Sequence, residues 1–305
     1  MTRFAAVRIL RTLLTLIVSV SITFVVLRAS GDAALQILGP NARAPDIAAF
    51  RREWGLDQPI WVQYVLYLRN LLHGDLGKSM LDGQDALAIV LARVAVTLQL
   101  TLPALAVNIL LGIPAGICSA LYRDTVVDRS LMIASVIGFT VPSFVLALIL
   151  ILVFSVWLGV LPSGGADSLA SGVLPIATLG IGGAAVLARY TKSAMVAVLG
   201  RLYITAASAK GIRWKNVVRN HAFPNAAIPI VTLFGLMLGS QIAGSVLIEA
   251  VFGWPGIGQL LVTSVANRDL AVVQVILLLV TATMTVSNLL VDVLYGFIDP
   301  RMRHA

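Results

Sequence analysis

Six long apolar stretches constrain this chain more than any other feature of its sequence. A helix needs about 20 residues to cross a hydrocarbon core roughly 30 Å thick, and most of these stretches reach that length. Only 12% of the 305 residues are charged, about half of the roughly 25% found in water-soluble domains. The sequence therefore predicts an all-α polytopic membrane protein with about six transmembrane helices, near residues 9–29, 94–121, 130–158, 172–190, 225–250 and 271–296.

Basic residues outside these stretches are unevenly divided between the two membrane faces. Fourteen Lys and Arg residues fall on the face that holds both termini, beside only three acidic residues. Seven of the other eight lie in residues 28–93, among seven acidic residues. Because cytoplasmic loops are enriched in Lys and Arg, this asymmetry predicts that both termini are cytoplasmic and that the number of spans is even. The net charge of +8 is then a topology signal, not a nucleic-acid-binding surface.

The extracytoplasmic segment 30–93 has the pattern of a small helical region. Ile47, Phe50 and Trp54 recur at helical spacing, and Gly55 follows them as a residue that commonly ends a helix. A second apolar stripe runs through residues 60–72. Two interpretations remain open for these helices. They lie on the helix bundle or the membrane interface, or they form a docking surface for a partner protein.

Nothing in the sequence predicts a catalytic or metal-binding centre. Residues 74–79 read Gly-Asp-Leu-Gly-Lys-Ser, but a phosphate-binding loop would also need glycine at position 72, which is Leu. The single cysteine, Cys118, excludes a disulfide framework and any metal site built from cysteines. We therefore expect a non-enzymatic chain that binds no cofactor or metal of its own.

Uncharged polar residues within the predicted spans are candidates for lining a solute pathway. A polar side chain that faces lipid is costly unless it finds a hydrogen-bond partner. These residues are therefore expected either to form hydrogen bonds between helices or to contact solute. The candidates are Gln99, Asn108, Gln241 and Asn288.

Two acidic residues in the last two spans raise an alternative hypothesis. Glu249 falls near the outer end of the fifth span and Asp292 near the inner end of the sixth, where water is expected to be available. An ionisable residue inside a membrane is a functional candidate. Either residue could form structural hydrogen bonds, or it could relay protons in a stand-alone secondary transporter.

The loop 191–224 is the longest predicted cytoplasmic loop and the most basic one. Residues 203–210 are good helix formers without a breaker, and Gly211 follows them as a helix stop. Ala206, Ala207 and Ala209 would leave a smooth helix surface that fits a partner's groove, with basic residues around it. The residues alone leave two interpretations open: a helix that receives force from a motor protein, and a helix that lies on the membrane surface.

The same loop resembles the EAA loop of binding-protein-dependent ABC importers. That pattern is Glu-Ala-Ala, three residues, Gly, nine residues and Ile-x-Leu-Pro. Ala206, Ala207, Gly211 and Pro224 match it, whereas Thr205, His221 and Phe223 replace Glu, Ile and Leu. Further stretches resemble the first (B-type) permease subunit of the dipeptide, oligopeptide and nickel permeases over nearly the whole chain: residues 55–64, 74–79, 110–116, 142–144, 209–211, 221–225, 249–256 and 299–301.

This resemblance implies a single type I ABC importer transmembrane domain over residues 1–305, in a bacterial plasma (inner) membrane. It implies a heterodimer with a homologous permease, two cytoplasmic ABC ATPase subunits that use ATP and Mg²⁺, and an extracytoplasmic solute-binding protein. The solute would be a di- or oligopeptide, or a related small solute such as a nickel chelate. Segment 191–224 would be the coupling loop, with the ATPase contacted by Tyr203, Thr205, Ala206, Ala207, Lys210, Gly211 and Pro224.

Overall fold

A computed structural model shows how the chain divides. It describes residues 2–298, and side chains from residue 8 to residue 291. The helices form two compact units: Met1–Thr97 with Pro255–Thr285, and Leu98–Trp254 with Val286–Ala305. We call these unit 1 and unit 2. The long helices α5 (Ala86–Leu121) and α13 (Leu270–Ile298) contribute residues to both units.

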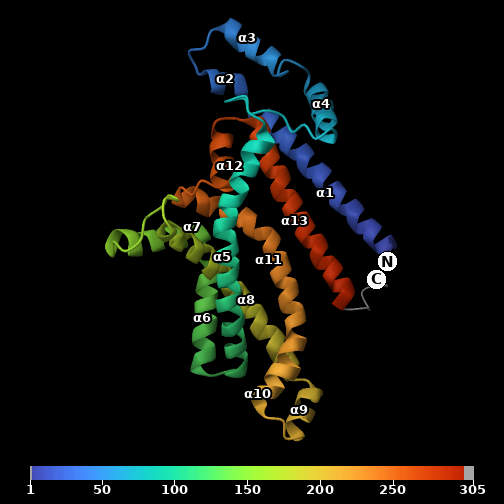
Figure 1. The fold of residues 1–305 in the computed structure, drawn as a ribbon, viewed down its shortest axis with the longest axis vertical. Helices are drawn as coiled ribbons and strands as arrows, with labels where there is room; N and C mark the ends of the chain where they lie inside the picture. The colour runs from blue at the N-terminus through green and yellow to red at the C-terminus, as the bar shows by residue number, and fades with distance from the viewer. Residues whose placement is uncertain (1, 299–305) are drawn as a thin grey trace. The chain divides into compact units, whose positions relative to one another are not determined.

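The described part of the chain holds five helices that are long and apolar enough to cross a membrane, or six spans if one bent pair is counted. The five lie in α1 (Thr2–Ala29), α5, α8 (Val173–Leu199), α11 (Phe223–Phe252) and α13 (Figure 1). Both the short first stretch and the glycine-rich fourth stretch are therefore continuous helices, as predicted.

The predicted span 130–158 is interrupted by a sharp bend, which makes it a broken span or a re-entrant loop. Helix α6 (Val126–Thr140) and the pair α7 (Ser143–Leu150) and η1 (Ile151–Trp157) meet at an angle of 104°. Val141 between them is extended, with φ −70° and ψ 121°. The cause is Pro142, since proline disfavours the helical conformation of the residue before it.

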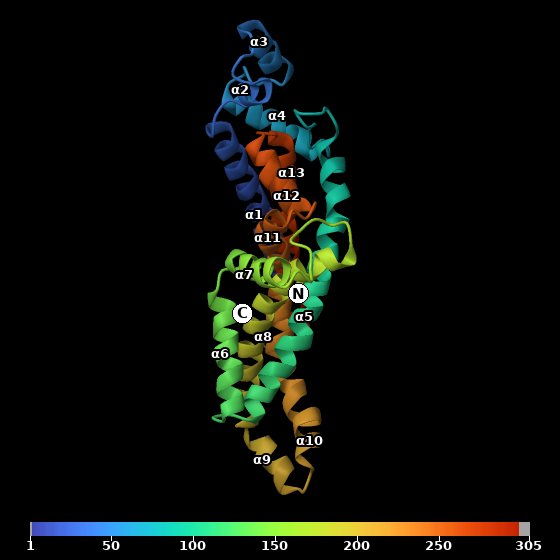
Figure 2. The same ribbon diagram turned by 90° about the vertical axis from the view of Figure 1, so that its left-hand side faces the viewer.

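Helix α8 lies at the centre of unit 2 and packs closely against α5. Gly112 and Gly116 of α5 face the backbone of α8, and a Cβ at Gly116 would lie only 2.5 Å from the carbonyl oxygen of Ala188. Gly183 of α8 is equally close to the side chain of Asn108. Small residues on both helices therefore allow the two backbones to approach closely. Helices α6 and α11 also pack on α8 (Figure 2).

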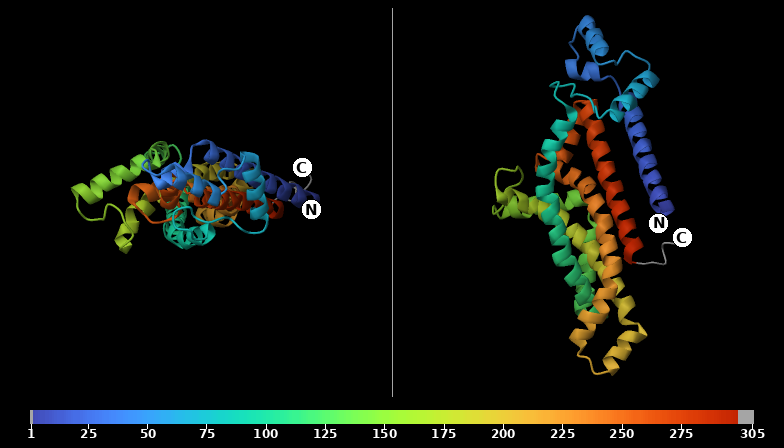
Figure 3. Two further views of the ribbon diagram at one scale, coloured as in Figure 1. Left: turned by 90° about the horizontal axis from the view of Figure 1, so that it is seen from above. Right: turned by 45° about the vertical axis from the view of Figure 1, so that its right-hand side comes forward.

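Unit 1 contains the predicted extracytoplasmic helices and one helix that the apolar pattern did not indicate. The two predicted stripes form α3 (Ala44–Glu53) and α4 (Ile60–Leu72), and the additional short helix is α2 (Ala33–Leu38). These three helices follow the end of α1 (Figure 3). Unit 1 also includes α12 (Ile257–Ala266) and a core built around Val90, Ile257 and Ile276.

Candidate coupling surface and its support

The loop 191–224 folds into a short helix with a built-in stop. Helix α9 (Leu202–Ala209) begins one residue before the predicted helix, and Gly211 beyond its end has φ +78°. The amide nitrogen of Gly211 donates to the carbonyl oxygen of Ser208 (3.0 Å), and that of Ile212 donates to Ala207 (3.4 Å). These two bonds form the Schellman motif, which favours glycine at the left-handed position. The predicted glycine stop is therefore confirmed.

One face of α9 is built into the core of unit 2. Ile204 and Ala207 are buried in a cluster with Met195 of α8 and with Val217 and Ala222 of the following segment. Ala207 was expected at the contact surface for a partner, but its side chain points into this cluster. Its role is therefore to seat α9, because a buried methyl group cannot contact another protein.

The opposite face of α9 is open and partly apolar. Leu202 is 88% exposed and Tyr203 is 44% exposed, and Trp214 nearby is 54% exposed. Leu202 and Trp214 are not among the residues predicted to contact a partner, although large apolar residues in a strongly basic loop are a usable signal. The remaining predicted contact residues are also exposed: Thr205, Ala206, Lys210, Gly211 and Pro224.

The segment after α9 carries the chain back into the long helix α11. It contains α10 (Trp214–Val217) and the π-helical turn η3 (Val218–Ala222). Pro224 lies in the first turn of α11. Proline is tolerated there because the first turn of a helix does not need the backbone N–H group that proline lacks. Because Val217 and Ala222 are fully buried, this return segment and α9 form one packed element.

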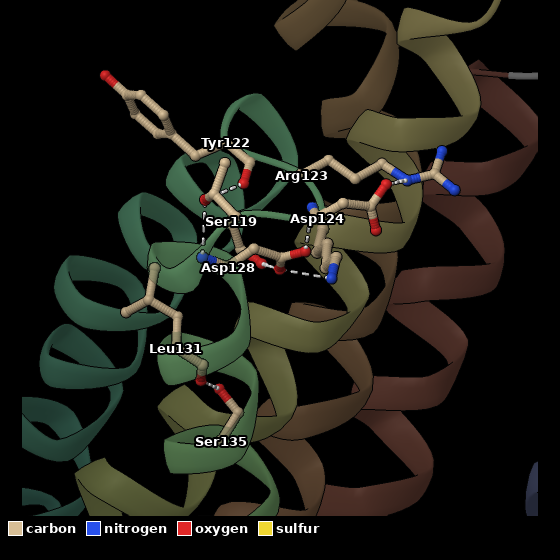
Figure 4. A network of polar contacts seen from close by, with 9 residues as sticks. Ser119, Tyr122, Arg123, Asp124, Asp128, Leu131 and Ser135 are labelled. Atoms are coloured by element: carbon tan, nitrogen blue, oxygen red, sulfur yellow. Dashed lines mark hydrogen bonds and ion pairs between the residues drawn. The ribbon is translucent and has the colours of Figure 1, made fainter.

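A partly buried ion pair joins α8 to α6. Asp128 of α6 is 4% exposed and accepts hydrogen bonds from the Lys192 ammonium (2.6 Å), the Ser119 hydroxyl and the backbone nitrogen of Asp124 (3.0 Å). Figure 4 shows how these groups from α5, α6 and their connection converge. We call Ser119, Asp124, Asp128 and Lys192 the α8 clamp. In the sequence, Lys192 is only one of the fourteen basic residues that predict the topology.

The four polar residues predicted to line a pathway occupy different environments. Gln99 and Asn288 are exposed, whereas Gln241 is 9% exposed and its Nε2 atom has no hydrogen-bond partner among the described residues. Asn108 is fully buried, and its amide nitrogen can donate to the carbonyl oxygens of Ala104 (3.1 Å) and Gly180 (2.7 Å). Asn108 therefore joins α5 to α8 and does not belong to the proposed pathway surface.

The acidic residues behave differently from the expectation of nearby water. Glu249 is completely buried, and its carboxylate accepts a hydrogen bond from Ser245 (3.2 Å). Its position near the end of α11 does not expose it, because the chain turns back there through Gly253 and the buried Trp254. The side chain of Asp292 lies outside the described residues. Among the residues described, no group of three or more His, Cys, Asp and Glu side chains could hold a metal ion.

In the loop that resembles a phosphate-binding sequence, hydrogen-bond donors are already paired with carboxylates of the protein. The Ser79 hydroxyl and the Met80 backbone nitrogen (3.2 Å) both donate to the carboxylate of Asp269, and the Gly77 nitrogen donates to Asp75 (2.9 Å). We call Ser79, Met80 and Asp269 the loop clasp. Carboxylates thus take the donors that a phosphate would require, in agreement with the spacing argument.

Two related protein families together match nearly the whole chain. Residues 112–304 match the family described as binding-protein-dependent transport system inner membrane component. Residues 1–101 match the N-terminal family of the same membrane components. The first match contains α9 and its return segment, and the second contains the helices α1 to α4.

Curated relatives match along almost their full length. The glutathione transport system permease protein GsiC of Escherichia coli O6:H1 is 43% identical over 288 residues, which cover 94% of each chain. The protein of the same name from Salmonella paratyphi A is 42% identical and covers 95% of this chain and 94% of its own.

Solved structures share the fold at lower identity. A chain of the MetNI methionine ABC transporter, in inward-facing conformations, has a TM-score of 0.58 and 20% identity, and the match covers 69% of this chain and 96% of that one. A chain of an amino acid ABC transporter solved with histidines has a TM-score of 0.52 and 16% identity, covering 70% and 94%. The fold is that of type I ABC importer permeases.

Proposed function

The chain belongs to the family of binding-protein-dependent transport system inner membrane components and is a permease of an ABC importer; on this premise, we propose that α9 couples it to separate ATPase subunits. One observation carries the proposal. A capped helix is seated on the core by Ile204 and Ala207 while it presents Leu202 and Tyr203 outward. Exposed aromatic and aliphatic anchors are what a partner's groove would enclose.

The packing behind α9 gives a route for force. Because Ile204 contacts the same cluster as Met195 of α8 and Ala226 of α11, a push on α9 is carried directly to two apolar helices. Coupling between sites needs such a contiguous set of packed groups. In this proposal the chain hydrolyses no ATP, and ATP and Mg²⁺ are used by two partner ATPase subunits.

For the solute, we propose a peptide-like molecule. The curated relatives are named for glutathione, which is itself a small peptide, and no metal-binding group was found in the described residues that would favour a nickel chelate. A solute-binding protein would deliver the molecule to the face holding α2 to α4, and a homologous permease would complete the pathway. Both termini would then be cytoplasmic, as the charge asymmetry predicts.

One of the two candidate residues for a proton-driven carrier, Glu249, does not lie where water was expected. Glu249 is completely buried and hydrogen-bonded to Ser245 within α11, so no water reaches it in this conformation. The family match and the curated relatives give no support to a secondary transporter.

Two matched leucines provide the test. Leu202→Ser removes an anchor on α9, whereas Leu169→Ser changes an equally exposed leucine (97% exposed) in η2 (Leu169–Gly172), away from α9. The permease pair would be purified with its ATPases and reconstituted with the binding protein. We expect Leu202→Ser to lose ATPase subunits and solute uptake and Leu169→Ser to keep both. Equal retention and uptake by the two variants would refute the coupling role.

The single cysteine allows an independent check of sidedness. In a Cys118→Ala background, Ser208→Cys would place one thiol on the exposed face of α9. A membrane-impermeant maleimide should reach it only from the cytoplasmic side, and bound ATPase should protect it. Labelling from the outside would overturn both the orientation and the proposed contact.

A further inference from the structure

A partly buried arginine at the end of α1 has more donors than partners. Arg28 lies in the last turn of α1, and its guanidinium stacks over the ring of Phe24, 5.3 Å from the centroid. Its Nε and Nη1 atoms are closed off from solvent and have no hydrogen-bond partner among the described residues. Buried donors of a charged group are costly to leave unsatisfied, so the site calls for an acceptor.

The guanidinium borders a polar cavity of about 580 Å³ within unit 1, lined by Arg28, Asp32, Arg51, Asp57, Ile60 and Gln63 among others. Arg51 forms an ion pair with Asp32. Burial alone would raise the pKa of Asp32, but hydrogen bonds from Arg51 and the Ala34 backbone lower it below its usual value. Arg28, which is partly buried, and Asp57, which is exposed, are the remaining charged groups of the lining, and neither forms an ion pair with another described residue.

An apolar groove adjoins this cavity. Ser21, Phe24 and Val25 of α1 and Ile60, Trp61 and Tyr64 of α4 line a shallow, open groove of about 610 Å³ with almost no polar surface. Ile60 borders both the groove and the polar cavity, and Phe24 in the groove supports Arg28. The spacing 21, 24, 25 and 28 places the groove and the arginine on one face of α1. The Ser21 hydroxyl donates to the carbonyl oxygen of Ile17 (2.7 Å) and is hydrogen-bonded to the Tyr64 hydroxyl at 2.5 Å, so both hydroxyls have partners within the protein.

We propose that this face of unit 1 binds an aminophospholipid such as phosphatidylethanolamine. The phosphate is held by Arg28, the ammonium lies near Asp57, and one acyl chain fills the groove between α1 and α4. Phosphate oxygens are strong acceptors for a guanidinium, and the end of an apolar span lies at the depth of lipid headgroups.

The combination of features selects this ligand over simpler ones. A free phosphate or a small peptide would use the polar cavity and leave the apolar groove empty. A purely anionic lipid would find Arg28 but would place no cation beside Asp57. Only a zwitterionic amphiphile uses the arginine, the carboxylate and the groove together.

The test measures lipid retention by native mass spectrometry of the detergent-purified permease complex, titrated with phosphatidylethanolamine. We expect Arg28→Gln to weaken binding by at least roughly tenfold, since it removes a charge-assisted hydrogen bond. Asp57→Asn should reduce the preference for phosphatidylethanolamine over phosphatidylglycerol. The matched controls are Arg69→Gln and Glu53→Gln, which change exposed charges on α4 and α3 and should leave both quantities unchanged.

A third variant separates a lipid site from a headgroup-only site. Val25→Trp fills the groove without altering the polar cavity, so it should abolish binding of the diacyl lipid. This variant tests the proposal independently if Arg28→Gln does not fold. Equal retention by Arg28→Gln and Arg69→Gln would overturn the proposal. So would full competition by glycerophosphoethanolamine, inorganic phosphate or a small peptide, or normal lipid binding by Val25→Trp.

Discussion

Two buried aspartates are stabilised by different kinds of partner. Asp128 in unit 2 and Asp269 in unit 1 are only 4% and 2% exposed. Asp128 is met by the Lys192 ammonium at 2.6 Å as well as by neutral donors. Asp269 accepts from the Ser79 hydroxyl and the Met80 backbone nitrogen, and no ion pair to it was found among the described residues.

The difference shows two ways of keeping a carboxylate inside a protein. The α8 clamp neutralises the charge with a cation, so each partner depends on the other. The loop clasp satisfies the carboxylate with hydrogen bonds from one loop, so its loss frees that loop without leaving an opposite charge behind. Removing one partner of a buried ion pair is strongly destabilising because a lone charge remains, whereas a lost hydrogen bond costs less.

The largest effect is expected when the cation of the α8 clamp is removed. Lys192→Met leaves the Asp128 carboxylate without its counter-charge and should lower the midpoint of thermal unfolding by several degrees, the largest loss among these variants. Thermal unfolding in detergent measures this change. Lys215→Met, an exposed lysine of α10, is the control. The double variant Lys192→Met with Asp128→Asn should recover part of the loss, and a double variant no more stable than the single one would contradict the ion-pair account.

The loop clasp should show a smaller loss. Asp269→Ala removes the acceptor of both the Ser79 hydroxyl and the Met80 nitrogen, and we expect a cost of about 2 kcal/mol. Hydrogen exchange should rise in residues 74–85, while α8 and α9 stay protected. Glu53→Ala changes an exposed carboxylate of unit 1 outside this loop as a control. Faster exchange throughout unit 2 would mean that the clasp is not local.

A change at the end of α9 separates stability from coupling. Gly211→Leu forces a branched residue into the φ +78° position, at a cost of about 1.5 kcal/mol, and should uncouple ATP hydrolysis from uptake. Gly200→Leu is the control because Gly200 has φ −78°. ATPase stimulation and uptake are measured on the same reconstituted complexes. Normal values of both for Gly211→Leu would remove the coupling role from this turn.

The smallest predicted effect lies within the loop clasp itself. Ser79→Ala deletes one of the two donors to Asp269 and should cost about 1 kcal/mol. Combined with Asp269→Ala it should add less than its own cost, because the Ser79–Asp269 bond is already lost and only the acceptor of the Leu81 nitrogen is newly removed. Unfolding of the two single variants and the double variant gives the cycle. Strictly additive losses would show that Ser79 and Asp269 act independently.

The sequence predicted the helix α9 but could not predict its orientation. Alanine content and Gly211 are local signals, and the left-handed turn that they indicate is present. Which face of the helix is buried depends on Val217 and Ala222, which return to it from further along the chain. The same limit explains why Ala207 was assigned to the wrong face and why Leu202 was missed.

The sequence by itself determined the membrane class, the approximate positions of most spans and the family, because apolar length and short motifs are properties of adjacent residues. Only the tertiary structure decided the 104° bend after α6, the pairing of Asp128 with Lys192 and the clasp of Ser79 on Asp269. These interactions join residues that are 64 and 190 positions apart. Side-chain pairing over such separations follows from helix packing, and helix packing is a property of the folded chain.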